Sequence, residues 1–211
     1  VTDNQGHWTA ACELNHLRSG RYFGRPSATP DPQNLYNGRD NFTPPAVWFP
    51  YTLARSVSGM AEVLDDRFGP FRGQLLVGDF QNALVVRVFL ETINGEYQGA
   101  VFPFLNGFRS GVNRLSYGPD GRLYVGGLQR TWASIAPDPA SFERVTFKGN
   151  TPFSILKAEA KTDGFLLTFT EPARPSAAAP DNFEVSQFSY AYHPDYGSPR
   201  FNHAGEKDSQ T

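Results

Sequence analysis

Residues 69–78 read GPFRGQLLVG, and residues 118–126 read GPDGRLYVG. The Gly-Pro pairs start at positions 69 and 118, 49 residues apart, and the Val-Gly pairs start at 77 and 125, 48 apart. A glycine-rich turn that feeds an apolar strand once every ~45–50 residues is the period of a β-propeller blade. A blade is a small sheet that needs neighbours to bury its faces. The repeat therefore predicts an all-β chain built from propeller blades.

The length of the chain sets how much of a propeller it can form. At 211 residues it holds three or four blades of this period, whereas a closed ring of such blades usually needs about six or more. The sequence also starts at Val1 without an initiator Met or an apolar leader. We therefore expect the last blades of a six-bladed propeller, with the N-terminal blades of the same parent chain missing.

Charge and composition exclude several classes of function. The chain has 19 basic and 21 acidic residues and no run of Lys and Arg, which argues against nucleic acid as a partner. The longest apolar stretch, residues 83–90, is interrupted by Arg87, so no transmembrane segment is expected. Cys12 is the only cysteine, which excludes a disulfide framework and Cys-x-x-Cys sites. Few lysines with many aromatic residues favour a periplasmic or secreted protein that handles carbohydrate.

Turn residues and apolar alternation divide the chain into three parts. Residues 1–149 are predicted to form the propeller blades, and residues 150–196 the start of an appended, β-sandwich-like module with a hairpin around Gly164. Residues 197–211 are polar and aperiodic and are predicted to be disordered. No helix is predicted. Strands are expected at 46–53, 61–64, 74–79, 83–91, 99–104, 112–117, 122–127, 142–147, 153–160, 165–170 and 183–192.

Several motifs resemble the glucose/sorbosone dehydrogenase family, six-bladed propellers that oxidise sugars with pyrroloquinoline quinone (PQQ). Residues 4–6 (NQG), 13–15 (ELN) and 20–26 (GRYFGRP) are similar to the family's E-x-G-P, D-E-[LI]-N and G-x-N-Y-G-x-P segments. Residues 73–88 and 118–125 resemble its last two blades, and the region after 149 resembles the extension of large bacterial multidomain members. The resemblance covers residues 1–130. It implies the C-terminal portion of a quinoprotein whose parent oxidises a sugar or a related alcohol.

The resemblance also implies a calcium site near the N-terminus. The family's calcium-binding turn falls at Gln5, Gly6 and His7, where backbone carbonyl oxygens are suitable hard ligands. Glu13 falls at the family's metal-associated acid, and Asp3 adds a further oxygen nearby. The candidate metal ligands are therefore Gln5, Gly6 and Glu13. The alternative is a tight turn between blades that needs Gly6 for its backbone conformation.

The PQQ positions of the family carry different residues here. Its PQQ-binding Lys falls at Gln81, and its Arg-x-Arg pair falls at Gly111 and Asn113. PQQ has three carboxylates, which cationic side chains bind best. Arg109 and Arg114 lie close by and can substitute after a small register shift. The candidate cofactor-binding residues are Gln81, Arg109, Asn113 and Arg114, while the family's catalytic His falls in blades that this chain lacks.

Three functions remain open at this point. In the first, the parent is a PQQ- and calcium-dependent dehydrogenase of a small-molecule carbohydrate or alcohol, and this chain alone is inactive. In the second, the parent is a non-catalytic propeller of the same ancestry that binds carbohydrate or scaffolds other domains. The loss of three cations favours this second function. In the third, the chain is part of a general propeller interaction module.

Overall fold

The computed structural model of the protein describes residues 1–23, 42–130, 132 and 134–207. These residues form an all-β fold, a partial β-propeller, with three short 3₁₀ turns at Asp66–Phe68, Pro175–Ala178 and Pro180–Asn182. No helix in the described part of the chain has the length and apolarity needed to cross a lipid bilayer. The strands are β1 (Thr2–Asp3), β2 (Cys12–Leu14), β3 (Val47–Phe49), β4 (Val57–Glu62), β5 (Leu75–Asp79), β6 (Leu84–Ile93), β7 (Glu96–Leu105), β8 (Gly111–Tyr117), β9 (Leu123–Leu128), β10 (Ala140–Val145), β11 (Ile155–Lys161), β12 (Gly164–Phe169), β13 (Ser189–Tyr190) and β14 (Arg200–Phe201).

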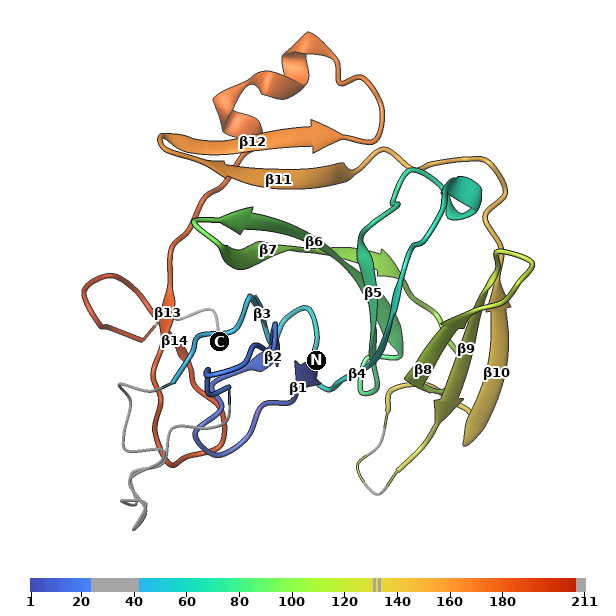
Figure 1. Cartoon of the computed structure of the whole chain (residues 1–211), viewed down its shortest axis with the longest axis horizontal. Coiled ribbons are helices and arrows are strands. Elements are labelled where there is room, and N and C mark those ends of the chain that lie inside the picture. Colours follow the sequence, from blue (N-terminus) through green and yellow to red (C-terminus); the bar gives the residue numbers. More distant parts are fainter. Residues whose placement is uncertain (24–41, 131, 133, 208–211) are drawn as a thin grey trace.

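Three antiparallel sheets form successive blades. Their strand orders are β1-β2-β3, β4-β5-β6-β7 and β8-β9-β10, so each sheet follows the chain from its first strand outward. The first strands are neighbours, because β4 contacts both β1 and β8 (Figure 1). The two sequence repeats supply β5 and β9, the second strands of neighbouring blades. The period of the repeat is therefore the period of the blades, as predicted.

The inner strands of the three blades are joined by side-chain hydroxyls. Thr2 Oγ1 donates to the carbonyl oxygen of Ser58 at 2.8 Å, and Ser58 Oγ donates to the carbonyl oxygen of Val112 at 2.8 Å. The strands also approach closely, since a Cβ on Gly59 would lie 2.9 Å from the carbonyl oxygen of Asn113. Small or hydroxyl-bearing residues at these positions let the blades meet at their inner edge.

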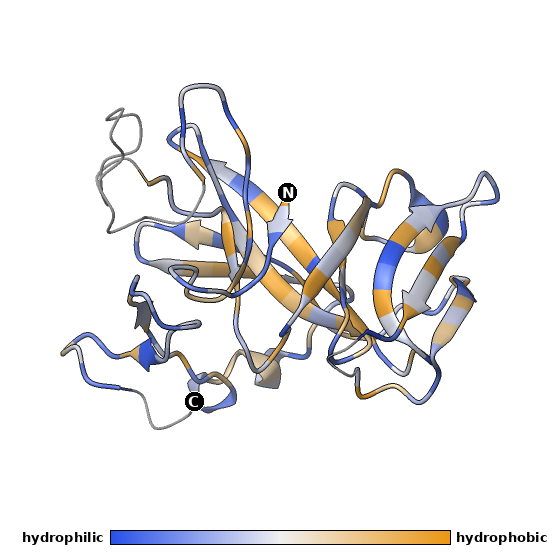
Figure 2. Cartoon of the chain, turned by 90° about the horizontal axis from the view of Figure 1, so that it is seen from below, coloured by the Kyte–Doolittle hydropathy of each residue, from blue (hydrophilic) through white to orange (hydrophobic). Residues whose placement is uncertain are grey.

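The hydrophobic core lies between the blades and has two parts. On β5, Leu76 packs toward the third blade, whereas the next residue, Val77, packs toward the first. On β6, Val85 likewise packs toward the third blade and Val86 toward the first. Successive side chains of a strand point to opposite faces, so the middle blade is covered on both sides. Figure 2 shows hydrophobic residues concentrated along these central strands.

The predicted hairpin around Gly164 is present as β11 and β12, and the fully buried Arg87 attaches it to β6. The Arg87 guanidinium donates to the carbonyl oxygens of Leu156 at 2.7 Å and Ile155 at 2.6 Å, both on β11. It also donates to the side-chain oxygen of Gln74. The cation lies 4.6 Å from the ring centroids of Phe71 and Phe102.

The structure differs from the predicted strands most clearly near the C-terminal end of the chain. Of the alternating stretch 183–192, only Ser189 and Tyr190 form a strand, which pairs with Arg200 and Phe201. Alternation alone predicted a longer strand there, but a strand also needs a partner for its backbone groups. The division into residues 1–149, 150–196 and 197–211 stays a prediction, and residues 208–211 lie outside the described residues.

Candidate functional site

Two of the predicted cofactor residues, Gln81 and Arg109, lie at the same end of the middle and third blades. We call these two residues and the loop between β9 and β10 the blade-end site. Gln81 lies in the turn between β5 and β6, and Arg109 lies two residues before the start of β8. The loop between β9 and β10 contacts both residues. Ile135 N donates to the Gln81 carbonyl oxygen at 2.9 Å, and Asp138 N donates to the Arg109 carbonyl oxygen at 2.8 Å. The fold therefore brings Gln81 and Arg109 together through a shared loop.

The charge of Arg109 is already paired. Its Nε lies 2.5 Å from Oδ2 of Asp138, and its Nη2 lies 3.1 Å from Oδ1, which makes a two-point ion pair. The hydrogen bond from Arg109 to Asp138 holds the pKa of Arg109 above its ordinary value. The Arg109 backbone N–H donates to the Glu143 carboxylate at 2.9 Å. A ligand carboxylate at this site therefore competes with Asp138 for the guanidinium.

The other predicted cofactor positions lie on β8. A bulge falls between Val112 and Arg114 in the pairing of β8 with β9, and Asn113 occupies it. Arg114 Nη1 donates to the Asn113 carbonyl oxygen at 2.9 Å, and the Arg114 side chain is exposed. At Gly111 a Cβ would lie 2.6 Å from the Phe80 carbonyl oxygen. This backbone therefore has no space for a side chain at Gly111, where the family carries an Arg.

Asp79 organises the blade-end site, and the sequence analysis missed it. Its fully buried carboxylate accepts backbone N–H bonds from Arg55 at 2.7 Å, Ser56 at 2.6 Å and Asn82 at 2.6 Å. One side chain thus fixes both the entry to β4 and the turn that carries Gln81. An Asp at the start of a turn is a sequence signal for such a cap, because its carboxylate can accept backbone N–H groups a few residues further on.

Trp132 is an exposed aromatic residue near the same turn. Its ring packs edge-on against Phe80, with 6.1 Å between centroids, and 54% of the residue is accessible to solvent. The Arg130 guanidinium lies 5.7 Å from the Trp132 ring. The blade end thus combines an exposed indole with polar backbone turns, an arrangement suited to a flat, hydroxyl-bearing ligand.

The residues predicted to bind calcium are engaged in other bonds. The Gly6 carbonyl oxygen accepts from Thr9 N at 3.2 Å and from Gly197 N at 3.0 Å, which occupies both lone pairs. The Gln5 side-chain amide donates to the Ala10 carbonyl oxygen at 3.4 Å. In this arrangement the carbonyl at the centre of the turn is not free for a metal.

Glu13 is the acid of the predicted calcium site, and it is 3% exposed. Its Oε1 accepts from Asn15 Nδ2 at 2.7 Å, and burial raises its pKa to about 7. Within the described ranges no cluster of three His, Cys, Asp or Glu side chains can hold a metal ion. The residues as arranged do not fit calcium, and the site at Gln5, Gly6 and Glu13 stays a prediction.

Comparison with known proteins gives the same family as the motifs. The sequence model of the glucose/sorbosone dehydrogenase family matches residues 6–130, more than half of the chain. No curated protein sequence matches.

Three similar solved structures cover part of the chain. One, named for a putative oxidoreductase (glucose dehydrogenase) from Thermus thermophilus, is 22% identical, covers 67% of this chain and 39% of its own, and has a TM-score of 0.48. Two glucose dehydrogenase structures are 25% and 21% identical, cover 59% and 69% of this chain and 35% and 40% of their own, and have TM-scores of 0.44 and 0.48. The chain thus spans about two fifths of the length of these structures.

Proposed function

The chain belongs to the glucose/sorbosone dehydrogenase family, and we propose that it forms the C-terminal blades of a sugar dehydrogenase-like propeller. The parent protein would oxidise a sugar or a related alcohol in the periplasm or outside the cell. One observation carries this proposal: three consecutive blades meet along their inner strands through the bonds of Thr2 and Ser58. That arrangement presents the loops of the blade-end site, where propellers carry their functional residues.

The residues at the blade end do not fit PQQ as its main binding groups. A cofactor with three carboxylates needs several free cations, yet Gln81 is neutral and Arg109 is paired with Asp138. Of the four predicted cofactor residues, as the structure describes them, only Arg114 offers a cation without a carboxylate partner. At Gly111, the contact with Phe80 leaves no space for an arginine side chain. These observations favour a second candidate function, a non-catalytic propeller of the same ancestry that binds carbohydrate.

The two functions are distinguished by reconstituting the full-length parent with PQQ and calcium and measuring dye reduction with a panel of aldoses. The dehydrogenase function requires sugar-dependent dye reduction that needs added PQQ. Sugar binding without dye reduction, and without saturable PQQ binding, would support the non-catalytic propeller instead. The absence of both sugar binding and dye reduction would contradict both candidate functions.

Gln81 offers a sharper test of the residue matching. If Gln81 occupies the position of the family's PQQ-binding Lys, Gln81→Lys should tighten PQQ binding by roughly 10- to 100-fold, because one charge-assisted bond contributes about 1.5–3 kcal/mol. Gln98→Lys is the matched control, since Gln98 lies on β7 and donates to Glu91 at 2.9 Å. Equal PQQ affinity of both variants would show that the matching at Gln81 is wrong.

A further inference from the structure

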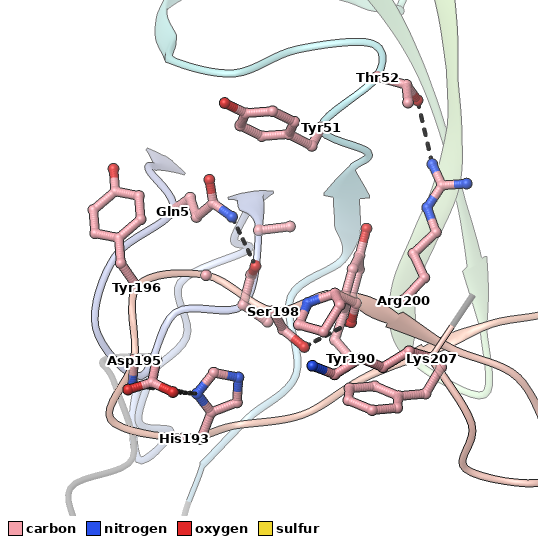
Figure 3. Close-up of a pocket in the computed structure, with 15 residues that line it drawn as sticks. Gln5, Tyr51, Thr52, Tyr190, His193, Asp195, Tyr196, Ser198, Arg200 and Lys207 are labelled. Carbon is pink, nitrogen blue, oxygen red and sulfur yellow. Dashed lines mark hydrogen bonds and ion pairs between the residues drawn. The ribbon is translucent and has the colours of Figure 1, made fainter. Parts of the chain in front are cut away.

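A pocket of about 640 Å³ lies away from the residues of the blade-end site. Three segments that are distant in the sequence form its walls: residues 5–11, the loop after β3 at residues 51–52, and residues 190–201, with Lys207 (Figure 3). Pockets that hold small molecules typically measure ~300–1,000 Å³. The pocket therefore has the size of a ligand site.

The main chain holds the walls of this pocket together. Gly197 N donates to the Gly6 carbonyl oxygen at 3.0 Å, and Ser198 N donates to the Ala10 carbonyl oxygen at 2.8 Å. Trp8 N donates to the His193 carbonyl oxygen at 3.0 Å. These bonds fix the C-terminal segment against the N-terminal turn without any ligand. A site formed in advance loses less conformational freedom when a ligand binds.

Gly197 is required for this close approach. It has a φ of +68°, and a Cβ built on it would lie 1.8 Å from the Gln5 side-chain nitrogen. A larger residue would therefore be strained in its backbone and would also displace Gln5 from the pocket wall. Substitution of Gly197 is therefore a specific way to disturb the pocket.

The lining combines aromatic faces with hydrogen-bonding groups. Tyr51 is 48% and Tyr196 67% exposed, and Figure 3 shows the Gln5 amide between them. The Asp195 carboxylate supplies acceptors, and the Arg200 guanidinium, which donates to Thr52 at 3.2 Å, supplies donors. The lining thus carries a negative group, Asp195, and a positive one, Arg200. A lining with charges of one sign only would favour a simple ion, and this lining is not of that kind.

We propose that this pocket binds a neutral saccharide. The C–H face of a sugar ring packs on an aromatic ring, while its hydroxyl groups both donate and accept hydrogen bonds, and this lining offers partners for both. The packing faces are Tyr196 and the face of Tyr51 opposite Arg55, whose guanidinium lies 4.5 Å from the Tyr51 ring centroid. Gln5, Asp195 and Arg200 bind the hydroxyl groups. The inference uses none of the blade-end residues, so it stands apart from the proposed oxidation.

The test is calorimetric titration of the full-length parent with cellohexaose, xylohexaose and mannohexaose, each at millimolar concentration. Binding of at least one oligosaccharide is expected, and Tyr51→Ala and Tyr196→Ala should each weaken it by roughly tenfold, the loss of one aromatic contact. Tyr97→Ala is the control, because Tyr97 is 41% exposed on β7 and outside the pocket.

Two results would overturn the proposal. One is the absence of binding by all three oligosaccharides, and the other is binding that both tyrosine variants leave unchanged. Gly197→Ala should also reduce binding, and circular dichroism of every variant separates loss of the pocket from loss of the fold. Dye reduction by the same variants is a separate readout, since it reports on the proposed oxidation and not on this pocket.

Discussion

The hydroxyl group of Ser58 donates a 2.8 Å hydrogen bond to the carbonyl oxygen of Val112 and so joins the inner strands of two neighbouring blades. The space around this bond is full, because a Cβ on Gly78 would lie 2.7 Å from Ser58 Oγ and 2.5 Å from Val112 Cγ1. The blades are thus held by a polar bond set among tightly packed apolar atoms.

Ser58→Ala should lower the free energy of unfolding by about 1 kcal/mol, the usual contribution of one neutral hydrogen bond. Urea unfolding followed by tryptophan fluorescence measures this change. Ser116→Ala is the control, since Ser116 is exposed on β8. Equal losses in the two variants would mean that the bond between the blades does not contribute.

Arg87→Met should release the β11–β12 hairpin. The change removes the arginine donor of the Ile155 carbonyl oxygen and one of the two donors of the Leu156 carbonyl oxygen, which keeps its bond from Gln74, and we expect a loss of about 3 kcal/mol. Hydrogen exchange followed by mass spectrometry should show faster exchange across residues 155–161. Arg144→Met, at an exposed position of β10, should leave that exchange unchanged. Full protection of β11 in Arg87→Met would contradict the attachment.

Glu13 should make stability depend on pH. Burial raises its pKa from 4.5 to about 7, so the folded protein keeps this proton over a range in which the unfolded chain has lost it. The contribution of protonated Glu13 to the free energy of unfolding is complete below about pH 4.5. It falls by about 3 kcal/mol as the pH rises to about 7, and it does not change further above that pH. Unfolding measured from pH 4 to pH 8 should show this fall. Glu13→Gln should remove it, whereas Glu184→Gln, at an exposed position, should retain it.

Calcium should not raise the unfolding temperature of the protein. The Gly6 carbonyl oxygen is bonded to Thr9 and Gly197, and Glu13 is buried, so a metal would have to break existing bonds to enter. Thermal unfolding with millimolar CaCl₂, compared with MgCl₂, tests this. A rise specific to calcium that shrinks in Glu13→Gln would support the metal site predicted at Gln5, Gly6 and Glu13.

The sequence predicted the features of the fold that depend on local pattern. The glycine turns and apolar strands at positions 69 and 118 indicated the blades, and Gly164 indicated the hairpin, because turn conformation and alternation are encoded within a few residues. The bond from Gly197 to Gly6 joins residues at opposite ends of the chain. No local pattern specifies such a contact, so the pocket that it forms was not predicted.

The sequence indicated which residues lie at the blade end but not how they are engaged there. Resemblance placed Gln81 and Arg109 near a cofactor, and the fold does bring them to the same end of neighbouring blades. The pairing of Arg109 with Asp138 and the contact between Gly111 and Phe80 depend on how the loops pack. The sequence shows which residue types are present at these positions but not which of them are already engaged.

Arg87 has a consequence for how the hairpin of this protein can change. Its guanidinium binds the peptide oxygens of Ile155 and Leu156, and Gln74 Nε2 also donates to the oxygen of Leu156, at 2.9 Å. Every amino-acid sequence has such peptide oxygens. The junction therefore does not restrict the side chains of the hairpin. A different β-hairpin grafted onto the same blade could accept the same hydrogen bonds from Arg87 and Gln74.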